Sequence, residues 1–341
     1  MHSYLTAMYK KPMIKGEYKK VFIYGLCDVY YDSYYIYGIK EIFSKIEFNI
    51  SKFPNFNQGT FAFIIIEGEQ EKKIIIDSKD SNRIDKEALN WCDKYGKINY
   101  HEETIASFES SSKIVAIGPS FGIKIWDIFE TTWYGISNLL KYKSKITNKR
   151  EFIANYWRQY KRVLLENYCP NKSMDDEVFF ISSIWAKEHA TNNFRASFIS
   201  ECKKNKNLKF VGGFAPRKDG NNYGFDSLLF FKRIPLTSYL MKIKKSAFVF
   251  NTPAVLSCHG WKLAEFLALG KVIITSTHKN IMPEVLEDDI HVVYVESSQD
   301  IEKKIKKMIT NLDFKKKLEI NSRDYYERNL APKVVIIKLL N

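Results

Sequence analysis

The sequence predicts an α/β protein of two domains, each built on a mostly parallel, layered sheet. Strand-length apolar runs alternate with helical segments along the chain, as they do where helices cover a parallel sheet. A proline break at Cys169-Pro170, followed by polar residues, divides the chain, and the same alternation restarts after it. The 341 residues are enough for two ordinary domains that each bury a core. We therefore predict domains at residues 1–170 and 171–330 and a tail at residues 331–341.

In the N-terminal half, the apolar runs and the glycine and proline residues beside them predict four strands and four helices. The strands are expected at residues 20–24, 60–66, 73–76 and 114–117. The helices are expected at about residues 34–45, 83–94, 126–143 and 150–167. No G-x-G-x-x-G follows the first strand, which counts against a nicotinamide or flavin enzyme.

The second half repeats the alternation of strands and helices. Its strands are expected at residues 178–182, 208–211, 247–251, 272–275 and 291–295. Its helices are expected at about residues 189–203, 236–244 and 260–269, with two charged helices after them that end near Asn329. This order is that of a compact Rossmann-like domain.

The composition is that of a folded protein, and its net positive charge is compatible with binding an anionic partner. Hydrophobic residues make up 45% of the chain and aromatic residues 15%, which excludes a disordered or fibrous protein. The formal charge of +14 is compatible with nucleic acid, an anionic membrane face or a phosphorylated substrate, or with solvated helix faces alone. No apolar run is long enough to span a membrane, and residues 1–20 lack the pattern of a signal peptide. We therefore expect a cytoplasmic protein.

The cysteines argue against a disulfide framework and against a structural zinc site. There are five, scattered along the chain and never in a C-x-x-C pair. Cys258 lies beside His259, but no second pair completes four ligands. No D-x-D stands in a strand-end loop, so no bound metal is expected.

The most informative segment, residues 251–275, is expected to form a strand, a loop, a helix, a glycine stop and another strand. Ligands of open α/β sheets bind beyond the carboxyl ends of the strands, at helix N-termini. His259 and Gly260 are therefore expected to offer backbone N–H groups to a phosphate, and Lys262 adds a positive charge. Glu265 lies among apolar residues and needs hydrogen bonds, which ribose hydroxyls would provide. The alternative is an i,i+3 pair with Lys262 at a solvent edge.

The run Gly260-Trp-Lys-Leu-Ala-Glu-Phe-Leu-Ala-Leu-Gly-Lys-Val-Ile-Ile resembles the donor-binding signature of GT-B glycosyltransferases. With the preceding Thr-Pro-Ala-Val, it is similar to the enzymes of bacterial capsule and surface-polysaccharide clusters. The resemblance implies two Rossmann-like domains that face each other across a cleft, with Glu265 on the donor ribose. The residues that it implies around the diphosphate and the sugar are Cys258, His259, Gly260, Trp261 and Lys262. Many retaining members carry an acidic residue where this chain has Ser257, so retaining and inverting chemistry both stay open.

A second basic cluster follows the first strand of the C-terminal half. GT-B enzymes without a metal hold the donor diphosphate with an Arg/Lys pair from this region, which implies Arg195 and Lys187 as candidates. Arg195 shares a predicted helix face with Glu188 and Asn192, so a surface network is the alternative. Gly213, at a predicted strand end, would cradle the base or a phosphate, or serve a simple turn.

The N-terminal domain is expected to bind the acceptor. Asp28 and Asp32, in the loop after the first strand, are candidates for the base that takes the proton of an acceptor hydroxyl in an inverting reaction. Loop aspartates are more often turn formers or helix caps, which is the alternative for both. His259 is a further catalytic candidate.

We therefore predict a hexosyltransferase-like enzyme that moves a sugar from a nucleotide-sugar donor to a glycan or a lipid-linked saccharide in surface polysaccharide synthesis. The donor is a co-substrate, and no cofactor is expected. The positive charge suits a peripheral position at an anionic inner membrane face, and no nucleic-acid partner is expected. The alternatives are a basic nucleic-acid-binding α/β protein, whose charge would form an external stripe, and a non-catalytic sugar-nucleotide-binding module.

Overall fold

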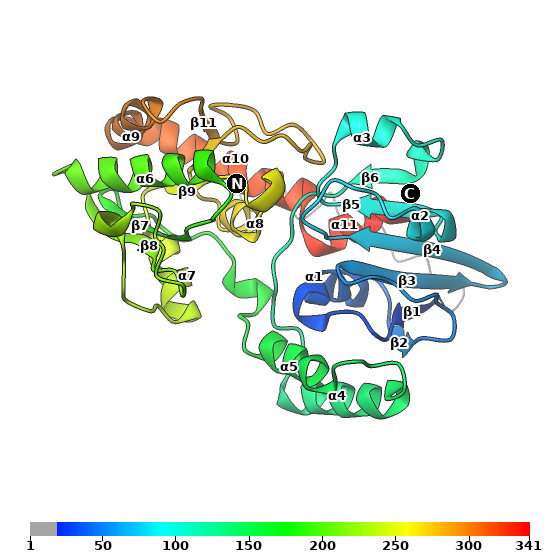
Figure 1. Cartoon of the computed structure of the whole chain (residues 1–341). Coiled ribbons are helices and arrows are strands. Elements are labelled where there is room, and N and C mark those ends of the chain that lie inside the picture. Colours follow the sequence, from blue (N-terminus) through cyan, green and yellow to red (C-terminus); the bar gives the residue numbers. More distant parts are fainter. Residues whose placement is uncertain (1–18) are drawn as a thin grey trace.

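The computed structural model describes residues 19–341, which form two α/β domains side by side (Figure 1). The predicted fold class, two Rossmann-like domains that face each other across a cleft, is confirmed. The prediction about a signal peptide concerns residues 1–20 and falls almost entirely outside the described residues. Among the described helices, none is long and apolar enough to cross a bilayer.

The N-terminal domain contains a six-stranded sheet in the order β2-β1-β3-β4-β5-β6. Its strands are β1 (Lys20–Tyr24), β2 (Lys45–Asn49), β3 (Thr60–Glu67), β4 (Gln70–Asp77), β5 (Lys94–Lys97) and β6 (Ile114–Ala116). β3 runs antiparallel to both of its neighbours, because only two residues connect it to β4 and so short a link can only form a hairpin. The other five strands run in one direction, so their carboxyl ends share one edge of the sheet.

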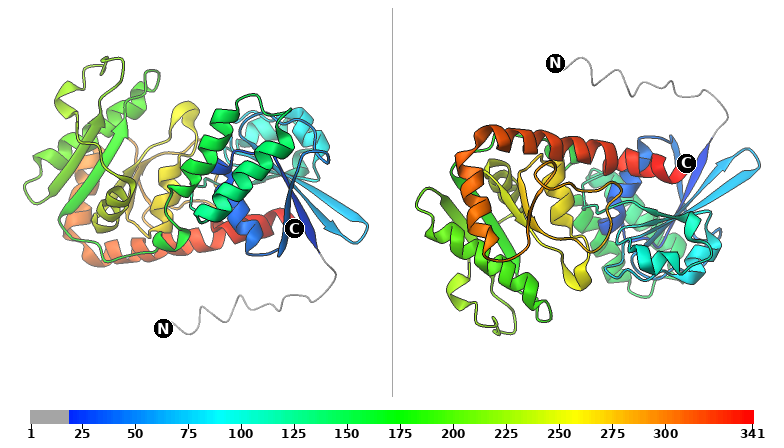
Figure 2. Two further views of the ribbon diagram at one scale, coloured as in Figure 1. Left: turned by 90° about the horizontal axis from the view of Figure 1, so that it is seen from below. Right: turned by 90° about the horizontal axis from the view of Figure 1, so that it is seen from above.

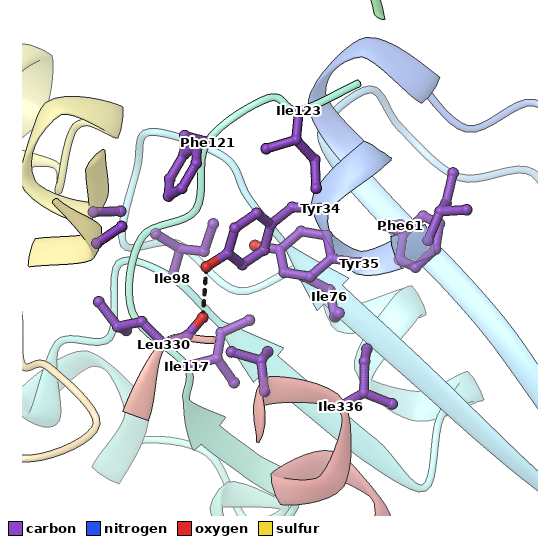
Figure 3. Packing of buried hydrophobic residues seen from close by; sticks show 14 of the residues in the cluster. Tyr34, Tyr35, Phe61, Ile76, Ile98, Ile117, Phe121, Ile123, Leu330 and Ile336 are labelled. Carbon is purple, nitrogen blue, oxygen red and sulfur yellow. Dashed lines mark hydrogen bonds between the residues drawn. The ribbon is translucent and has the colours of Figure 1, made fainter. Parts of the chain in front are cut away.

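Helices cover both faces of this sheet. One face holds α1 (Val29–Lys40) and α11 (Pro332–Leu340), and the other holds α2 (Lys86–Trp91) and α3 (Glu102–Ala106). Alternate strand residues point to opposite sides, so Ile76 joins the core beneath α1, as Figure 3 shows, while its neighbour Ile75 joins the other cluster.

The C-terminal domain contains five parallel strands in two hydrogen-bonded groups, β7-β8 and β9-β10-β11. They are β7 (Glu177–Ser183), β8 (Lys209–Ala215), β9 (Val249–Asn251), β10 (Ile273–Ser276) and β11 (Val293–Val295). β7 lies beside β9, so the groups follow one another edge to edge. One face is covered by α6 (His189–Lys204) and α9 (Asp300–Thr310). The other is covered by α7 (Leu236–Lys245), α8 (Trp261–Ala268) and α10 (Leu312–Asn329).

The chain crosses between the domains twice. The first crossing follows α4 (Ile128–Tyr142) and α5 (Lys149–Tyr160), a helical hairpin that packs on α1 through α5. The second runs from α10 into α11, so the segment predicted as a tail is a helix on the N-terminal domain (Figure 2). The hydroxyl of Tyr34 donates to the carbonyl of Leu330 at 2.7 Å and anchors this crossing to α1 (Figure 3).

Several predicted boundaries differ from the structure. The helix predicted at residues 34–45 is α1, which begins at Val29 because the Asp28 side chain caps it by accepting from the N–H of Tyr30. The helix predicted at residues 150–167 ends at Tyr160. The strand predicted at residues 208–211 continues to Ala215. The short elements β2, β5 and α3 were not predicted, since four or five residues carry too little periodicity to be recognised.

Candidate functional site

A cavity of about 310 Å³ lies between the domains. The N-terminal domain lines it from the first turn of α1 and from the loops after β4, β5 and β6, and the C-terminal domain lines it from the loops after β7 and β9. The carboxyl edges of both sheets therefore face this cavity, which is where ligands of open α/β sheets bind. Its charged and polar lining residues include Tyr30, Tyr31, Asp80, Cys258 and His259.

A second cavity of about 190 Å³ adjoins the first, because Gly260 and Trp261 line both. It belongs to the C-terminal domain and lies at the carboxyl ends of β7 and β9. Arg195 and Lys262 line it, and no carboxylate does. The structure thus brings together four of the predicted donor residues in a positively charged hollow.

The N-terminus of α8 opens at this hollow. Gly260 is the cap residue and offers no side-chain hydrogen bond to the helix. Within the described chain, the N–H groups of Gly260, Trp261 and Lys262 have no hydrogen-bond acceptor. The N–H of His259 differs from the prediction, because the Oδ1 of Asn99 accepts from it at 2.8 Å. Three unpaired donors and the positive end of the helix remain for an anion.

The two cations beside these donors are held by neutral groups. The Nε of Arg195 donates to Thr252 Oγ1 at 2.9 Å, and its Nη1 donates to the carbonyl of Ser183 at 2.9 Å. Lys262 Nζ donates to the carbonyl of Ile181. Burial lowers the pKa of Arg195 to about 10. Burial, and then the charge of Arg195, lower the pKa of Lys262 to about 7. Arg195 and Lys262 are buried cations that repel each other, and a bound anion would stabilise both charges.

Glu265 is buried on the inner side of α8, so the alternative of a pair with Lys262 at a solvent edge is wrong. Glu265 lines neither cavity, in contrast to its predicted place on the donor ribose. Its Oε1 lies 3.4 Å from the Nη2 of Arg162. Burial raises the pKa of Glu265, and the charges of Arg162 and Lys262 lower it in part. Arg162 comes from the crossing after α5, and its Nε also donates to the carbonyl of Gly122 at 2.8 Å. The sequence reasoning missed Arg162.

Trp261 packs between the domains. Its ring centroid lies 5.6 Å from that of Tyr30 and 5.3 Å from that of Tyr31. The guanidinium of Arg162 lies 5.2 Å from the Trp261 ring. A Cβ at Gly122 would lie 3.0 Å from this ring, so the glycine allows the close approach. Trp261 therefore forms the wall that separates Glu265 and Arg162 from the larger cavity.

His259 lines the larger cavity, and its imidazole is buried. Both of its ring nitrogens are buried without a hydrogen-bond partner in the described part of the chain. Burial lowers its pKa to about 4, which the backbone of Ile281 and Asn280 partly offsets. The ring is therefore neutral at pH 7 and can donate one hydrogen bond and accept another. The ring of His278 lies 5.3 Å away.

Asp80 is the one carboxylate among the residues described around the larger cavity, and the sequence reasoning missed it. The Cys258 thiol lies 3.6 Å from its Oδ1. Burial and Asp80 raise the pKa of Cys258 to about 12, so this thiol stays protonated. The loop is anchored just before Asp80: Lys79 N donates to Asp77 Oδ1 at 3.0 Å, and Asn99 Nδ2 donates to Lys79 O at 2.9 Å.

Asp28 and Asp32 do not line either cavity. Asp28 has the role of helix cap that the alternative predicted, with 3.1 Å between its Oδ1 and the N–H of Tyr30. Asp32 is buried within α1, and burial together with Asp28 holds its pKa well above the usual range. It therefore favours the protonated form at its present position.

Lys187 and Gly213 also lie outside both cavities. Lys187 is exposed in the loop before α6. Gly213 lies inside β8 with a φ of +149°, and a Cβ there would come within 2.4 Å of the carbonyl oxygen of Leu228. Close backbone packing explains this glycine.

Two adjacent residues in the loop before α8, Leu256 and Ser257, have left-handed backbone conformations, with φ of 55° and 59°. Each such conformation costs about 1 kcal/mol or more for a residue with a side chain. The N–H of Leu256 donates to Glu188 Oε1 at 3.0 Å, and the carbonyl of Ser257 accepts from Asn280 Nδ2 at 3.0 Å. These contacts stabilise the loop that presents Cys258 and His259.

Among residues 19–341, no group of three or more His, Cys, Asp or Glu side chains is placed to hold a metal ion. The described cysteines are all unpaired.

No protein-family model and no curated protein sequence matches the chain. Solved structures with a similar chain trace include glycosyltransferases, as the sequence resemblance predicted. One is the C-terminal domain of a glycosyl transferase group 1 family protein from Francisella tularensis, with 17% identity, a TM-score of 0.34, and coverage of 48% of this chain and 95% of that chain.

Another is HepE of Anabaena in complex with UDP-glucose, with 12% identity, a TM-score of 0.41, and coverage of 75% of this chain and 65% of that chain. A third is the glycosylation associate protein complex of Streptococcus agalactiae, with 12% identity, a TM-score of 0.45, and coverage of 79% and 49%. This chain thus spans less than two thirds of the length of the last two. At these scores, the similarity concerns the course of the chain and not its chemistry.

Proposed function

We propose that this protein is a glycosyltransferase that uses a nucleotide-sugar donor without a metal ion. The observation that carries the proposal is the hollow at the N-terminus of α8. There Arg195 and Lys262 and three unpaired N–H groups lie beside a cavity that both domains line. Helix N-termini with adjacent cations favour phosphate groups. A donor diphosphate in the hollow would place the sugar in the interdomain cavity, next to the acceptor domain.

The nucleoside would lie along α8 with its ribose at Glu265, as the sequence resemblance implies. Arg162 supports this role, because its Nη2 lies 3.4 Å from Glu265 Oε1 and its charge offsets part of the rise in pKa that burial causes. His259 would bind a sugar hydroxyl through its unused ring nitrogens.

In the proposed reaction, an acceptor hydroxyl attacks the anomeric carbon, and the bond from that carbon to the donor phosphate oxygen breaks. Arg195, Lys262 and the N–H groups of α8 stabilise the negative charge that develops on the leaving diphosphate. In an inverting reaction, the Asp80 carboxylate takes the hydroxyl proton. In a retaining reaction, the departing phosphate oxygen takes it. We propose Asp80, rather than Asp28 or Asp32, because it lines the cavity.

The acceptor in this proposal is a glycan or a lipid-linked saccharide in the synthesis of a surface polysaccharide, in the cytoplasm. The sequence resemblance around Gly260 and Glu265 supports this part of the proposal.

The test is a thermal-shift screen of the full chain with UDP-, GDP-, CMP- and dTDP-sugars, followed by a transfer assay with the donor that binds. We expect one nucleotide class to raise the melting temperature, and Lys262→Met to reduce the shift strongly. Lys187→Met is the matched control, because Lys187 is exposed and lines neither cavity. The proposal fails if no nucleotide sugar stabilises the protein, or if both variants behave alike. Donor binding without transfer to any acceptor would identify the non-catalytic module instead.

A further inference from the structure

The outer face of α4 exposes four large apolar side chains. Phe129 is 81% exposed, Trp133 71%, Ile136 51% and Leu140 69%. Their spacing of four, three and four residues places all of them on one side of the helix. We call this row of four residues the α4 stripe. It extends about 17 Å along the helix, at 1.5 Å per residue.

The opposite side of α4 holds the helix on the protein. Asn138 is buried there, and its Nδ2 donates to the hydroxyl of Tyr156 on α5 at 2.9 Å. A Cβ at Gly135 would lie 3.4 Å from the Tyr156 ring, so the two helices approach closely. The α4 stripe therefore points away from the molecule. Figure 1 shows α4 at the outer rim of the N-terminal domain, beyond α5.

Such a row is unusual on a surface that faces only water. Single exposed apolar residues are common, but contiguous apolar patches mark a contact surface. The α4 stripe also includes Trp133 and Phe129, whose large rings partition into the interface between lipid headgroups and acyl chains.

Positive charge borders the stripe at its carboxyl end. Between residues 141 and 150 the chain has five cations and no acidic residue. All five are exposed, and none forms an ion pair with a carboxylate within the described residues. These five residues, which we call the basic border, are Lys141, Lys143, Lys145, Lys149 and Arg150.

We propose that the α4 stripe and the basic border form a docking surface for an anionic lipid bilayer. The stripe would enter the outer part of the bilayer, and the basic border would contact anionic headgroups. A protein partner is disfavoured because lysine is depleted in protein interfaces, and here it accounts for four of the five bordering charges. This inference stands apart from the proposed function, since it uses no residue of either cavity.

The position of the surface relates it to the interdomain cavity. α4 packs on α5, and α5 packs on α1, whose first turn carries Tyr30 and Tyr31 into the cavity lining. Docking through α4 therefore attaches the N-terminal domain, which we expect to bind the acceptor, to the bilayer. A saccharide on a lipid carrier would then be close to the site.

The experiment is sedimentation of the full chain with vesicles of phosphatidylcholine, with or without a third of anionic phosphatidylglycerol. We expect binding to the anionic vesicles that weakens with salt. Each cation of the basic border contributes a factor of about five to affinity, so Lys143→Gln with Lys145→Gln should weaken binding about twenty-fivefold. Phe129→Ser with Trp133→Ser should also reduce binding at least tenfold. Phe231→Ser is the matched control, because Phe231 is 78% exposed but lies in the C-terminal domain.

Folding controls and fluorescence quenching by brominated lipids test whether any loss of sedimentation comes from the α4 stripe itself. Unchanged melting temperatures and circular dichroism would show that the variants fold. Brominated lipids should quench the tryptophan fluorescence of the wild type, and Trp133→Phe should lose most of this quenching while it still sediments. Equal sedimentation with neutral and anionic vesicles, or no loss in the stripe variant, would overturn the proposal. A dimer that the stripe variant converts to a monomer would overturn it as well, because a second copy would then cover the stripe.

Discussion

Lys262 connects donor binding to pH. Its pKa in the ligand-free protein is lowered to about 7, so above pH 7 the ligand-free side chain is mostly neutral. A diphosphate beside it favours the charged form and raises this pKa. Binding above pH 7 therefore takes up a proton, and affinity falls as pH rises, by at most tenfold per pH unit.

We expect the dissociation constant of the nucleotide sugar to be constant below pH 7 and to rise above it. Titration calorimetry between about pH 6 and pH 9 checks this, in buffers of different ionisation enthalpy that report proton uptake. Lys262→Met should bind weakly at every pH, with no proton uptake. His259→Gln should keep the pH dependence of the wild type, because the pKa of His259 is about 4 and its ring is neutral throughout this range. A wild-type affinity that does not change between pH 7 and pH 9 would contradict the role given to Lys262.

Glu265 and Arg162 form a buried pair, and two substitutions of Glu265 separate the effect of its charge from that of its hydrogen-bonding capacity. Glu265→Ala leaves the guanidinium of Arg162 buried without its carboxylate, and we expect a loss of about 2–4 kcal/mol in the free energy of unfolding. Glu265→Gln keeps an acceptor for Arg162 and should cost less than half of that. Urea unfolding of both variants gives the two values. Equal losses would mean that the charge of Glu265 contributes nothing to this contact.

At the scale of single residues, the structure brings Arg195, Gly260 and Lys262 together around one cavity, and the sequence predicted all three as donor-binding candidates. Arg195, Gly260 and Lys262 are recognisable because a helix N-terminus and nearby cations follow strand ends within one domain. Asp80 and Arg162 were missed for one physical reason. Each acts across the gap between the domains, and no periodicity along one segment reports a partner that is about a hundred or more residues away, such as Arg162 and Glu265 or Asp80 and Cys258.

At the scale of elements, β8 continues through Gly212 and Gly213, although the sequence predicted the strand to end before them. Gly212 has a φ of +148°, and a Cβ there would come within 1.8 Å of the carbonyl oxygen of Phe180 on the neighbouring strand. Such a contact requires the strands β7 and β8 to separate. A β8 that moves would also move the end of β7, which carries Ser182 and Ser183 in the wall of the smaller cavity.

We therefore expect Gly212→Ala to destabilise the protein by about 3 kcal/mol or more, since strain and lost strand pairing add together. Gly224→Ala is the matched control. Gly224 also has a positive φ, of 80°, but nothing lies within 4 Å of its Cβ position, so only the backbone cost of about 1 kcal/mol applies. Differential scanning calorimetry of the two variants measures the difference. A loss for Gly212→Ala no larger than that for Gly224→Ala would show that the strands adjust freely.

Most helices and strands were predictable whatever their length, and the missed elements β2, β5 and α3 are short segments of mixed polar and apolar residues. β3, α6 and α10 have long runs with one period and clear ends. α11 was predicted only as a tail, although it has nine residues, because its apolar residues surround it and show no single face. Its location on α1 follows from tertiary contacts, such as the approach of Gly38 to Pro332, which the chain order does not reveal.

At the scale of the whole molecule, Asn99 connects the two sheets at their carboxyl edges. Its Oδ1 accepts from His259 N at 2.8 Å and from Asn280 Nδ2 at 3.3 Å, and both donors belong to the C-terminal domain. Its own Nδ2 is bonded within the N-terminal domain, to the carbonyl of Lys79 at 2.9 Å. This one side chain therefore holds the loop of Asp80 against the loop of His259.

Asn99→Ala removes these bonds and leaves the buried N–H of His259 unpaired. The arrangement in which the two domains are in contact should lose about 1–3 kcal/mol of free energy. The crossings after α5 and α10 remain, so we expect the domains to move apart while each stays folded. Small-angle scattering should show a larger radius of gyration for the ligand-free variant, and a bound nucleotide sugar should restore part of the difference if it contacts both domains. Asn82→Ala is the control, because Asn82 Nδ2 donates only to Thr104 Oγ1 within the N-terminal domain. If the radius of gyration of Asn99→Ala equals that of the wild type, the domains are held by the packing of Trp261 on Tyr30 and Tyr31, and not by this polar contact.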